Sequence, residues 1–205
     1  MPKIVDHRAR IDQLRETAFE LVLEHGVLAL SLDAAAEHAG LSLSTVRRAI
    51  RGRESLPRLA FQWATGRWRT QPWSSAPGAP RGEEPWNVPL RALVNDLPYS
   101  PRRAENELVR EALIGACAPR AAWAAEARDS RRSWLQATTR DLVTCLGVAV
   151  QERDAACDRT VALVLGVAAA SAAGLIAPER CVPLVVDHAD ALRAASLGRA
   201  SGPAA

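Results

Sequence analysis

Apolar residues recur at steps of three and four through most of this 205-residue chain, and no long run alternates with period two. The first clear stripe consists of Ile11, Leu14, Ala18, Leu21 and Val22. Steps of three and four place side chains on one face of an α-helix, whereas alternation is typical of a half-buried strand. Alanine is abundant, and the chain has only two Phe and one Tyr. We therefore predict an all-α fold.

The segment from Ser31 to Ile50 is typical of a helix-turn-helix. Ser31 and Ser42 belong to the residue types that are preferred at helix N-caps. Gly40 can adopt the left-handed conformation that a sharp helix end requires. We predict two short helices here, one from Ser31 to Gly40 and one beginning at Ser42, joined by a tight turn.

Arginine is concentrated in and after the second of these helices. Between Ser42 and Arg69 there are seven Arg residues and one acidic residue, Glu54, whereas the formal net charge of the whole chain is only +3. A local positive surface of this kind is suited to an anionic partner. The alternative is that the charged residues form the solvated face of an ordinary helix.

The second helix of the motif has an apolar side and a polar side. Val46, Ala49 and Ile50 fall on the side that can pack on the scaffold, and arginines fall on the opposite side. Such a helix can enter the major groove, where the planar fork of Arg binds guanine O6 and N7 together. Serine and threonine near the helix start can contact phosphate. The residues predicted to bind DNA are Ser31, Ser42, Leu43, Ser44, Thr45, Arg47, Arg48, Arg51 and Arg53.

Residues 10–61 resemble the DNA-binding region of the tetracycline-repressor (TetR) family of bacterial transcriptional regulators. The resemblance is carried by EHG at 24–26, SLDAAAEHAGLSLSTV at 31–46 and Arg-Glu-Ser-Leu at 53–56. It implies that Thr45 and Val46 open the recognition helix, and that Arg53 contacts phosphate.

Two positions depart from the family pattern. Arg47 stands where Tyr is usual, and Ile50 stands where Phe is common. The first departure changes a residue that commonly touches DNA, so the base preference of relatives does not carry over. The second only makes a core contact smaller.

The resemblance also implies a domain organisation. We expect a three-helix helix-turn-helix DNA-binding domain over residues 1–53 and a helical ligand-binding and dimerisation domain over residues 54–197, with about nine helices in total. Residues 198–205 are expected to be a disordered tail. Residues 73–85, which are rich in Pro, Gly and Ser, are expected to form an exposed linker or loop. The implied function is that of a homodimeric repressor, which binds a palindromic double-stranded operator and is released by a small molecule.

The sequence itself supports a dimer interface near the C-terminus. Residues 161–177 carry no charge, and small residues four apart leave one helix face nearly bare. The last helix has apolar residues with a spacing of about 3.5. Two such helices from each subunit could form a four-helix bundle, although they could instead bury each other within one chain. The predicted interface residues are Gly166, Ala170, Gly174, Val182, Val185, Ala189 and Leu192.

Six Trp residues are many for a chain so poor in other aromatic residues. An aromatic-lined cavity between the central helices would suit a small apolar or aromatic effector. The alternative is that these residues are ordinary core and loop-anchoring residues. The residues predicted to line an effector pocket are Leu113, Cys117, Trp134 and Leu142.

The sequence has no GxSxG elbow, no phosphate-binding glycine loop and no HExxH motif. We therefore expect no enzymatic activity, no catalytic residue, no cofactor and no metal, and we interpret DHAD at 187–190 as the polar side of a helix. The four Cys form no CxxC pair, and neither an export leader nor a membrane span is expected, which indicates a cytoplasmic protein. The alternatives are a nonspecific nucleic-acid binder and a helical small-molecule enzyme or redox sensor.

Overall fold

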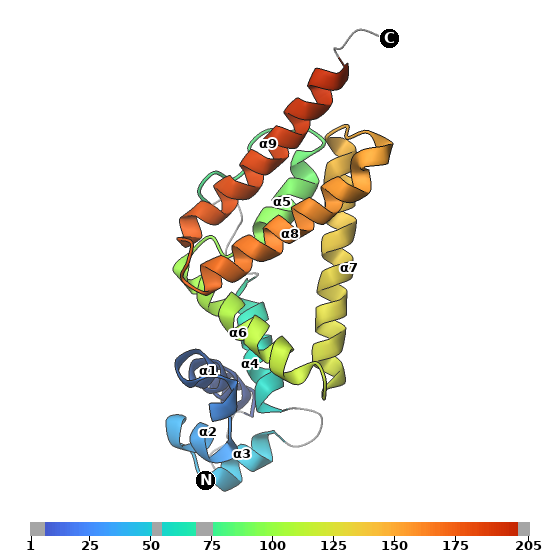
Figure 1. Ribbon diagram of the computed structural model, residues 1–205. Coiled ribbons are helices and arrows are strands. Elements are labelled where there is room, and N and C mark those ends of the chain that lie inside the picture. Colours follow the sequence, from blue (N-terminus) through green and yellow to red (C-terminus); the bar gives the residue numbers. More distant parts are fainter. Residues whose placement is uncertain (1–6, 51–54, 69–75, 201–205) are drawn as a thin grey trace. The chain divides into compact units, whose positions relative to one another are not determined.

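The computed structural model describes residues 7–50, 55–68 and 76–200. Within these residues it contains nine α-helices and no strand (Figure 1), which confirms the predicted all-α fold and the predicted number of helices. The helices are α1 (His7–His25), α2 (Leu32–His38), α3 (Leu43–Ala49), α4 (Leu56–Trp68), α5 (Asn87–Asn95), α6 (Pro101–Cys117), α7 (Ala122–Cys145), α8 (Arg153–Ala172) and α9 (Cys181–Ala200).

The chain divides into two compact units. Unit 1 consists of residues 1–70 and 108–128, and unit 2 consists of residues 71–107 and 129–205. The division falls within α6 and α7, because each of these helices contributes residues to both units. The domain boundary expected between residues 53 and 54 stays a prediction. Helix α9 extends to Ala200, and residues 201–205 of the expected tail lie outside the described residues.

The core of unit 1 depends on close packing of α1 against α4. Ala18 of α1 lies in one buried cluster with Ala60 and Ala64 of α4. Small side chains at these positions let the two helix backbones approach each other. Phe61 of α4 also contacts Trp123 at the start of α7, with ring centroids 5.3 Å apart. Helix α1 is therefore supported by α4, which in turn contacts the start of α7.

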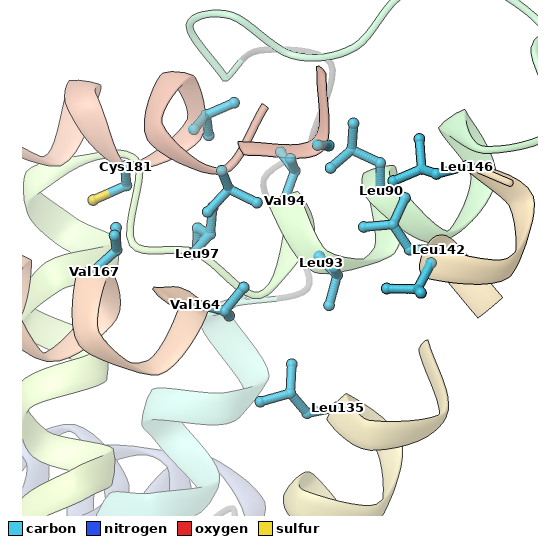
Figure 2. Close-up of a cluster of buried hydrophobic side chains, with 14 of the residues drawn as sticks. Leu90, Leu93, Val94, Leu97, Leu135, Leu142, Leu146, Val164, Val167 and Cys181 are labelled. Atoms are coloured by element: carbon cyan, nitrogen blue, oxygen red, sulfur yellow. The ribbon is translucent and has the colours of Figure 1, made fainter. Parts of the chain in front are cut away.

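The core of unit 2 is formed by α5, α7, α8 and α9 (Figure 2). Leu90 and Leu93 of α5 lie in one buried cluster with Leu142 of α7, Val164 of α8 and Cys181 of α9. Full burial of an aliphatic side chain contributes about 1.5–3 kcal/mol relative to exposure. Four helices are therefore held together by aliphatic burial, and α8 and α9 pack against each other (Figure 1).

Residues 76–86 form a loop between helices, and most of them are exposed, as their Pro and Gly content predicted. A Cβ atom added at Gly78 would lie 3.3 Å from the Cγ atom of Pro183, so this loop runs very close to α9. The Nε atom of Arg91 donates to the carbonyl oxygen of Pro80 over 3.4 Å. Ala76 and Pro80 are nevertheless buried, because Pro and Gly specify turn geometry and leave burial undecided. The part of the predicted linker before residue 76 lies outside the described residues.

Among the described residues, one helical stretch is long and apolar enough to cross a membrane by length and composition alone. It covers Val150–Ala172, and an 18-residue window within it has a mean hydropathy of 1.4. Val164 and Val167 from this stretch lie in the buried cluster of unit 2. Because the core helix of a soluble protein meets the same criterion, this stretch is weak evidence for a membrane span.

Candidate nucleic-acid interface

Helices α2 and α3 each begin at a serine, as the sequence predicted. The Oγ atom of Ser31 accepts a hydrogen bond from the backbone N–H of Ala34 over 3.1 Å. The Oγ atom of Ser42 accepts one from the backbone N–H of Thr45 over 3.2 Å. Each bond satisfies a backbone donor that has no partner within its own helix. The two serines therefore fix where both helices start.

The turn between α2 and α3 depends on Gly40. Its φ is +63°, in the left-handed region that favours glycine. The N–H of Leu41 donates to the carbonyl of Ala36 over 2.9 Å, and the N–H of Gly40 donates to that of Glu37 over 3.1 Å. This pair of bonds is the Schellman pattern of helix C-termini. It ends α2 sharply and fixes the turn from which α3 begins.

The inner side of α3 packs on α1, α2 and α4. Val46 and Ala49 are buried in one cluster with Leu14 of α1, Ala36 of α2 and Leu59 of α4. This confirms the predicted apolar side of the helix. The cluster determines which side of α3 faces solvent.

Two side-chain contacts that sequence reasoning missed hold α2 on α1. The Nε2 atom of Gln13 donates to the carbonyl of Ala39 over 3.0 Å. The Nε2 atom of His38 lies 3.2 Å from the Oε2 atom of Glu20. These partners are 26 and 18 residues apart in sequence, so no local pattern marks them. They support the end of α2, from which the turn to α3 begins.

The outer side of α3 carries exposed polar and cationic residues. Ser44, Arg47 and Arg48 are exposed, whereas Leu43 and Thr45 are half-buried. Neither Arg47 nor Arg48 has a hydrogen bond or an ion pair with another described residue. Their charges are therefore not neutralised within the described part of the chain and remain available to an external anion.

The other predicted DNA-binding residues have different placements. Ser31 and Ser42 are exposed, and their hydroxyl groups serve as the caps of α2 and α3. The Oγ atom of Ser42 lies 3.0 Å from that of Ser44 and 2.8 Å from the Oγ1 atom of Thr45. Arg51 and Arg53 lie outside the described residues.

The four residues predicted to line an effector pocket are divided between the two units, and the pocket stays a prediction. Leu113 belongs to the buried cluster of unit 1, and Leu142 belongs to that of unit 2. Cys117 is half-buried, and Trp134 is 38% exposed. Trp134 lies on the same long helix as Leu142, but it is partly exposed, whereas Leu142 is fully buried.

Part of the predicted dimer interface belongs instead to the core of a single chain. Val182, Val185 and Ala189 are fully buried in the cluster of unit 2, and Leu192 packs against that cluster. These three side chains are already covered within their own subunit, and the interface stays a prediction. The stripe of period 3.5 on α9 is an intrachain seam.

The predicted interface residues at and after α8 divide into two kinds. Gly166 is exposed and Ala170 is half-buried, so both stay available to a partner. Gly174 lies beyond the end of α8 and has a φ of +73°. The N–H of Leu175 donates to the carbonyl of Ala170 over 2.8 Å, the same helix-ending pattern as at Gly40. Gly174 therefore terminates the helix and does not extend its bare face.

The described residues contain no cluster of three or more His, Cys, Asp or Glu that could hold a metal ion. Burial raises the pKa of the Cys117, Cys157 and Cys181 thiols. The thiolate is the reactive form of cysteine, so burial lowers the reactivity of these three side chains.

No protein-family model and no curated protein matches this sequence. Solved structures do match the fold. A TetR-like transcriptional regulator from Rhodococcus sp. RHA1 is 21% identical, with a TM-score of 0.61 over 98% of this chain and 100% of its own. A second transcriptional regulator from Rhodococcus sp. Rha1 is 20% identical, with a TM-score of 0.64 over 90% of this chain and 96% of its own. The chain therefore has the same fold as these regulators along almost its whole length.

Proposed function

We propose that this chain, which has the fold of TetR-like transcriptional regulators, is itself a sequence-specific DNA-binding regulator. One observation carries the proposal. Arg47 and Arg48 are exposed on α3 without a partner among the described residues, on a helix whose other side is buried through Val46 and Ala49. Two unneutralised cations on a firmly seated helix are suited to a polyanion.

The dimensions of the helix and of DNA agree with this proposal. An α-helix with its side chains is about 10–12 Å across, and the major groove of B-DNA is about 12 Å wide. A helix seated in the groove brings arginine within reach of guanine edges and of phosphates. In a helix-turn-helix, the second helix takes this place, which is the position of α3 after α2 and the Gly40 turn.

We further propose that the regulator is a homodimer, because two half-sites about one helical turn of DNA apart require two recognition helices. The outer side of α8 supports an interface. It has Leu165, Gly166 and Ala169 exposed next to one another along the helix. Leu175, shortly after the end of α8, is 81% exposed, and Leu197 in α9 is 59% exposed. Subunit association commonly buries large apolar side chains that a single chain leaves exposed to water.

The proposed mode of action is repression by a cytoplasmic protein that releases its operator when a small effector binds. The fold likeness is the support for this part of the proposal. If it is correct, reciprocity requires operator DNA to weaken effector binding by the same factor by which the effector weakens operator binding. A ligand that binds tightly and leaves operator affinity unchanged would contradict release by that ligand.

Selection of genomic DNA fragments by the purified protein at near-physiological salt tests the proposal. We expect wild-type protein to enrich a palindromic site, and the Arg47→Ala/Arg48→Ala variant to lose that enrichment. The matched control is Arg132→Ala/Arg140→Ala, which removes the same charge from exposed positions of α7. This control variant should still enrich the palindromic site. Retention of all sequences alike, with strong salt dependence, would instead identify a nonspecific nucleic-acid binder. No retention of DNA would contradict both functions.

A further inference from the structure

We infer that the two neighbouring arginines of α3 have different roles on DNA. Arg48 reads a guanine base in each operator half-site, and Arg47 binds the DNA backbone. The inference rests on the proposed function, and it names the partner more closely as an operator with a required G·C pair under Arg48. It follows from which direction each side chain leaves the helix.

The packed side of α3 defines an inward direction. Val46, Ala49 and Ile50 all pack in the cluster beneath the helix. Successive residues of an α-helix are rotated by about 100°, so the centre of these three positions can be located on the helix circumference. By the same rotation, Ser44 and Arg48 lie within about 30° of the directly opposite, outward direction. Both residues are exposed, which agrees with this assignment.

Arg47 leaves the helix in another direction. The same rotation places it about 75° to one side of the outward direction, and Thr45 about 85° to the other side. Thr45 is half-buried, and its Oγ1 atom lies 2.8 Å from the Oγ atom of Ser42. Arg47 is exposed, so one flank of the helix presents a cation and the other a short hydroxyl side chain.

In the major groove, the direction in which each side chain leaves the helix determines which part of the DNA it contacts. Because the helix nearly fills the groove, its outermost side chains meet the floor, where base edges lie, and its flanks meet the walls, where phosphates lie. Arg48 is thus directed at base edges and Arg47 at a phosphate wall. Ser44 lies one turn before Arg48 on the same outward line and is small, so it leaves room for the helix to approach the floor closely.

The donors and acceptors on the base edges then determine which base Arg48 binds. The fork of arginine matches guanine, which presents O6 and N7 as two adjacent acceptors in the major groove. Adenine presents a donor beside its N7, and an arginine has no acceptor to meet that donor. Arg48, which has no partner among the described residues and lies at the outermost position, therefore favours guanine over adenine.

The test compares Arg48→Ala with Arg47→Ala, two exposed neighbours that lose the same side chain and the same charge. A duplex library selected by wild-type protein first defines the operator, and binding of each protein is then measured on that operator and on single-base variants over a range of salt. Arg48→Lys serves as a third protein because it keeps the charge without the planar fork. Thermal unfolding checks that all three variants remain folded.

We expect wild-type protein to lose about 5- to 150-fold in affinity when the critical guanine of one half-site is replaced, as for one bidentate arginine contact. Arg48→Ala and Arg48→Lys should bind the original and the replaced site almost equally. Arg47→Ala should keep the discrimination and bind all sites more weakly. For this variant, the slope of log K against log salt should be shallower, by about 0.9 for each phosphate that the variant no longer neutralises.

Discrimination that survives in Arg48→Ala and disappears in Arg47→Ala would overturn the inference, and the proposed function would stand. An operator whose selected half-site contains no required guanine would overturn it in the same way. If wild-type protein selects no site at all, the proposed function fails and the inference fails with it.

Discussion

The Nη2 atom of Arg131 on α7 lies 2.9 Å from the Oε1 atom of Glu107 on α6, and the side chain of Glu107 is only 1% exposed. The same nitrogen lies 2.9 Å from the Oδ2 atom of Asp96. One guanidinium thus joins two carboxylates inside unit 2, and it connects α6, α7 and the segment after α5. A sequence contains no local signal for such a contact, because its members are 24 and 35 residues apart.

Replacement of Arg131 by Met should destabilise the protein by about 3–5 kcal/mol, because it removes the guanidinium that joins two largely buried carboxylates. Urea unfolding of wild-type and variant protein measures the change. Arg132→Met is the matched control, since Arg132 is the exposed neighbour on the same helix. It should stay within about 0.5 kcal/mol of wild type. Equal destabilisation of both variants would mean that the buried contact contributes nothing specific.

Substitution of alanine for two glycines should change stability in opposite directions. At Gly40 and at Gly115 an added Cβ atom would meet no other atom within 4 Å, so only the backbone decides the sign. Gly40 has a φ of +63°, which costs an L residue roughly 1–2 kcal/mol. Gly115 lies inside α6, where alanine is better than glycine by about 0.5–1 kcal/mol. Denaturant midpoints check both signs, and destabilisation by Gly115→Ala would show that α6 is constrained in another way.

Glutamate at position 165 should disrupt the proposed dimer. Leu165 on α8 and Leu108 on α6 are each 42% exposed in the single chain, so Leu165→Glu and Leu108→Glu introduce the same group at equally open positions. Only the first charge would have to be buried by association through α8. Sedimentation velocity should therefore find monomer for Leu165→Glu and dimer for Leu108→Glu. Dimers in both variants would exclude this side of α8 from the interface.

The stability of unit 2 should depend on the protonation of His188. Its Nε2 atom lies 2.9 Å from the Oγ1 atom of Thr160, and that hydroxyl donates to the carbonyl of Ala156. Thr160 therefore accepts, and neutral His188 carries its proton on Nε2. Burial, with the positive charge of Arg159, lowers the pKa of His188 below its usual value of 6.5.

Because the folded pKa of His188 is the lower one, the unfolded chain takes up this proton first as the pH falls. The contribution to stability is complete above about pH 6.5 and is lost as the pH drops towards the folded pKa. We expect the free energy of unfolding to fall more for wild-type protein than for His188→Gln between about pH 7.5 and pH 5.5. Urea unfolding at the two pH values measures this difference. An equal decrease in both proteins would indicate that His188 does not contribute to the acid sensitivity.

The sequence by itself determined the helices and the helix-turn-helix, because the signals for these features act within a few residues. A cap at Ser31 or Ser42 bonds a backbone N–H three residues later, and Gly40 meets a conformational requirement of its own backbone. Periodicity identified the inner side of α3 for the same reason. The polar outer side followed directly, including the exposure of Arg47 and Arg48.

Only the tertiary structure decided which partner covers each apolar stripe. The apolar residues of α9 have the spacing of an interface, yet Val185 is buried inside its own chain, whereas Leu165 on α8 remains 42% exposed. Periodicity reports that a helix has a face to bury, and it carries no information about whether the same subunit or another one buries it. The buried ion pairs of Arg131 and the close approach of Gly78 to Pro183 were also decided by contacts distant in sequence. Such contacts depend on how the helices assemble, which no local pattern encodes.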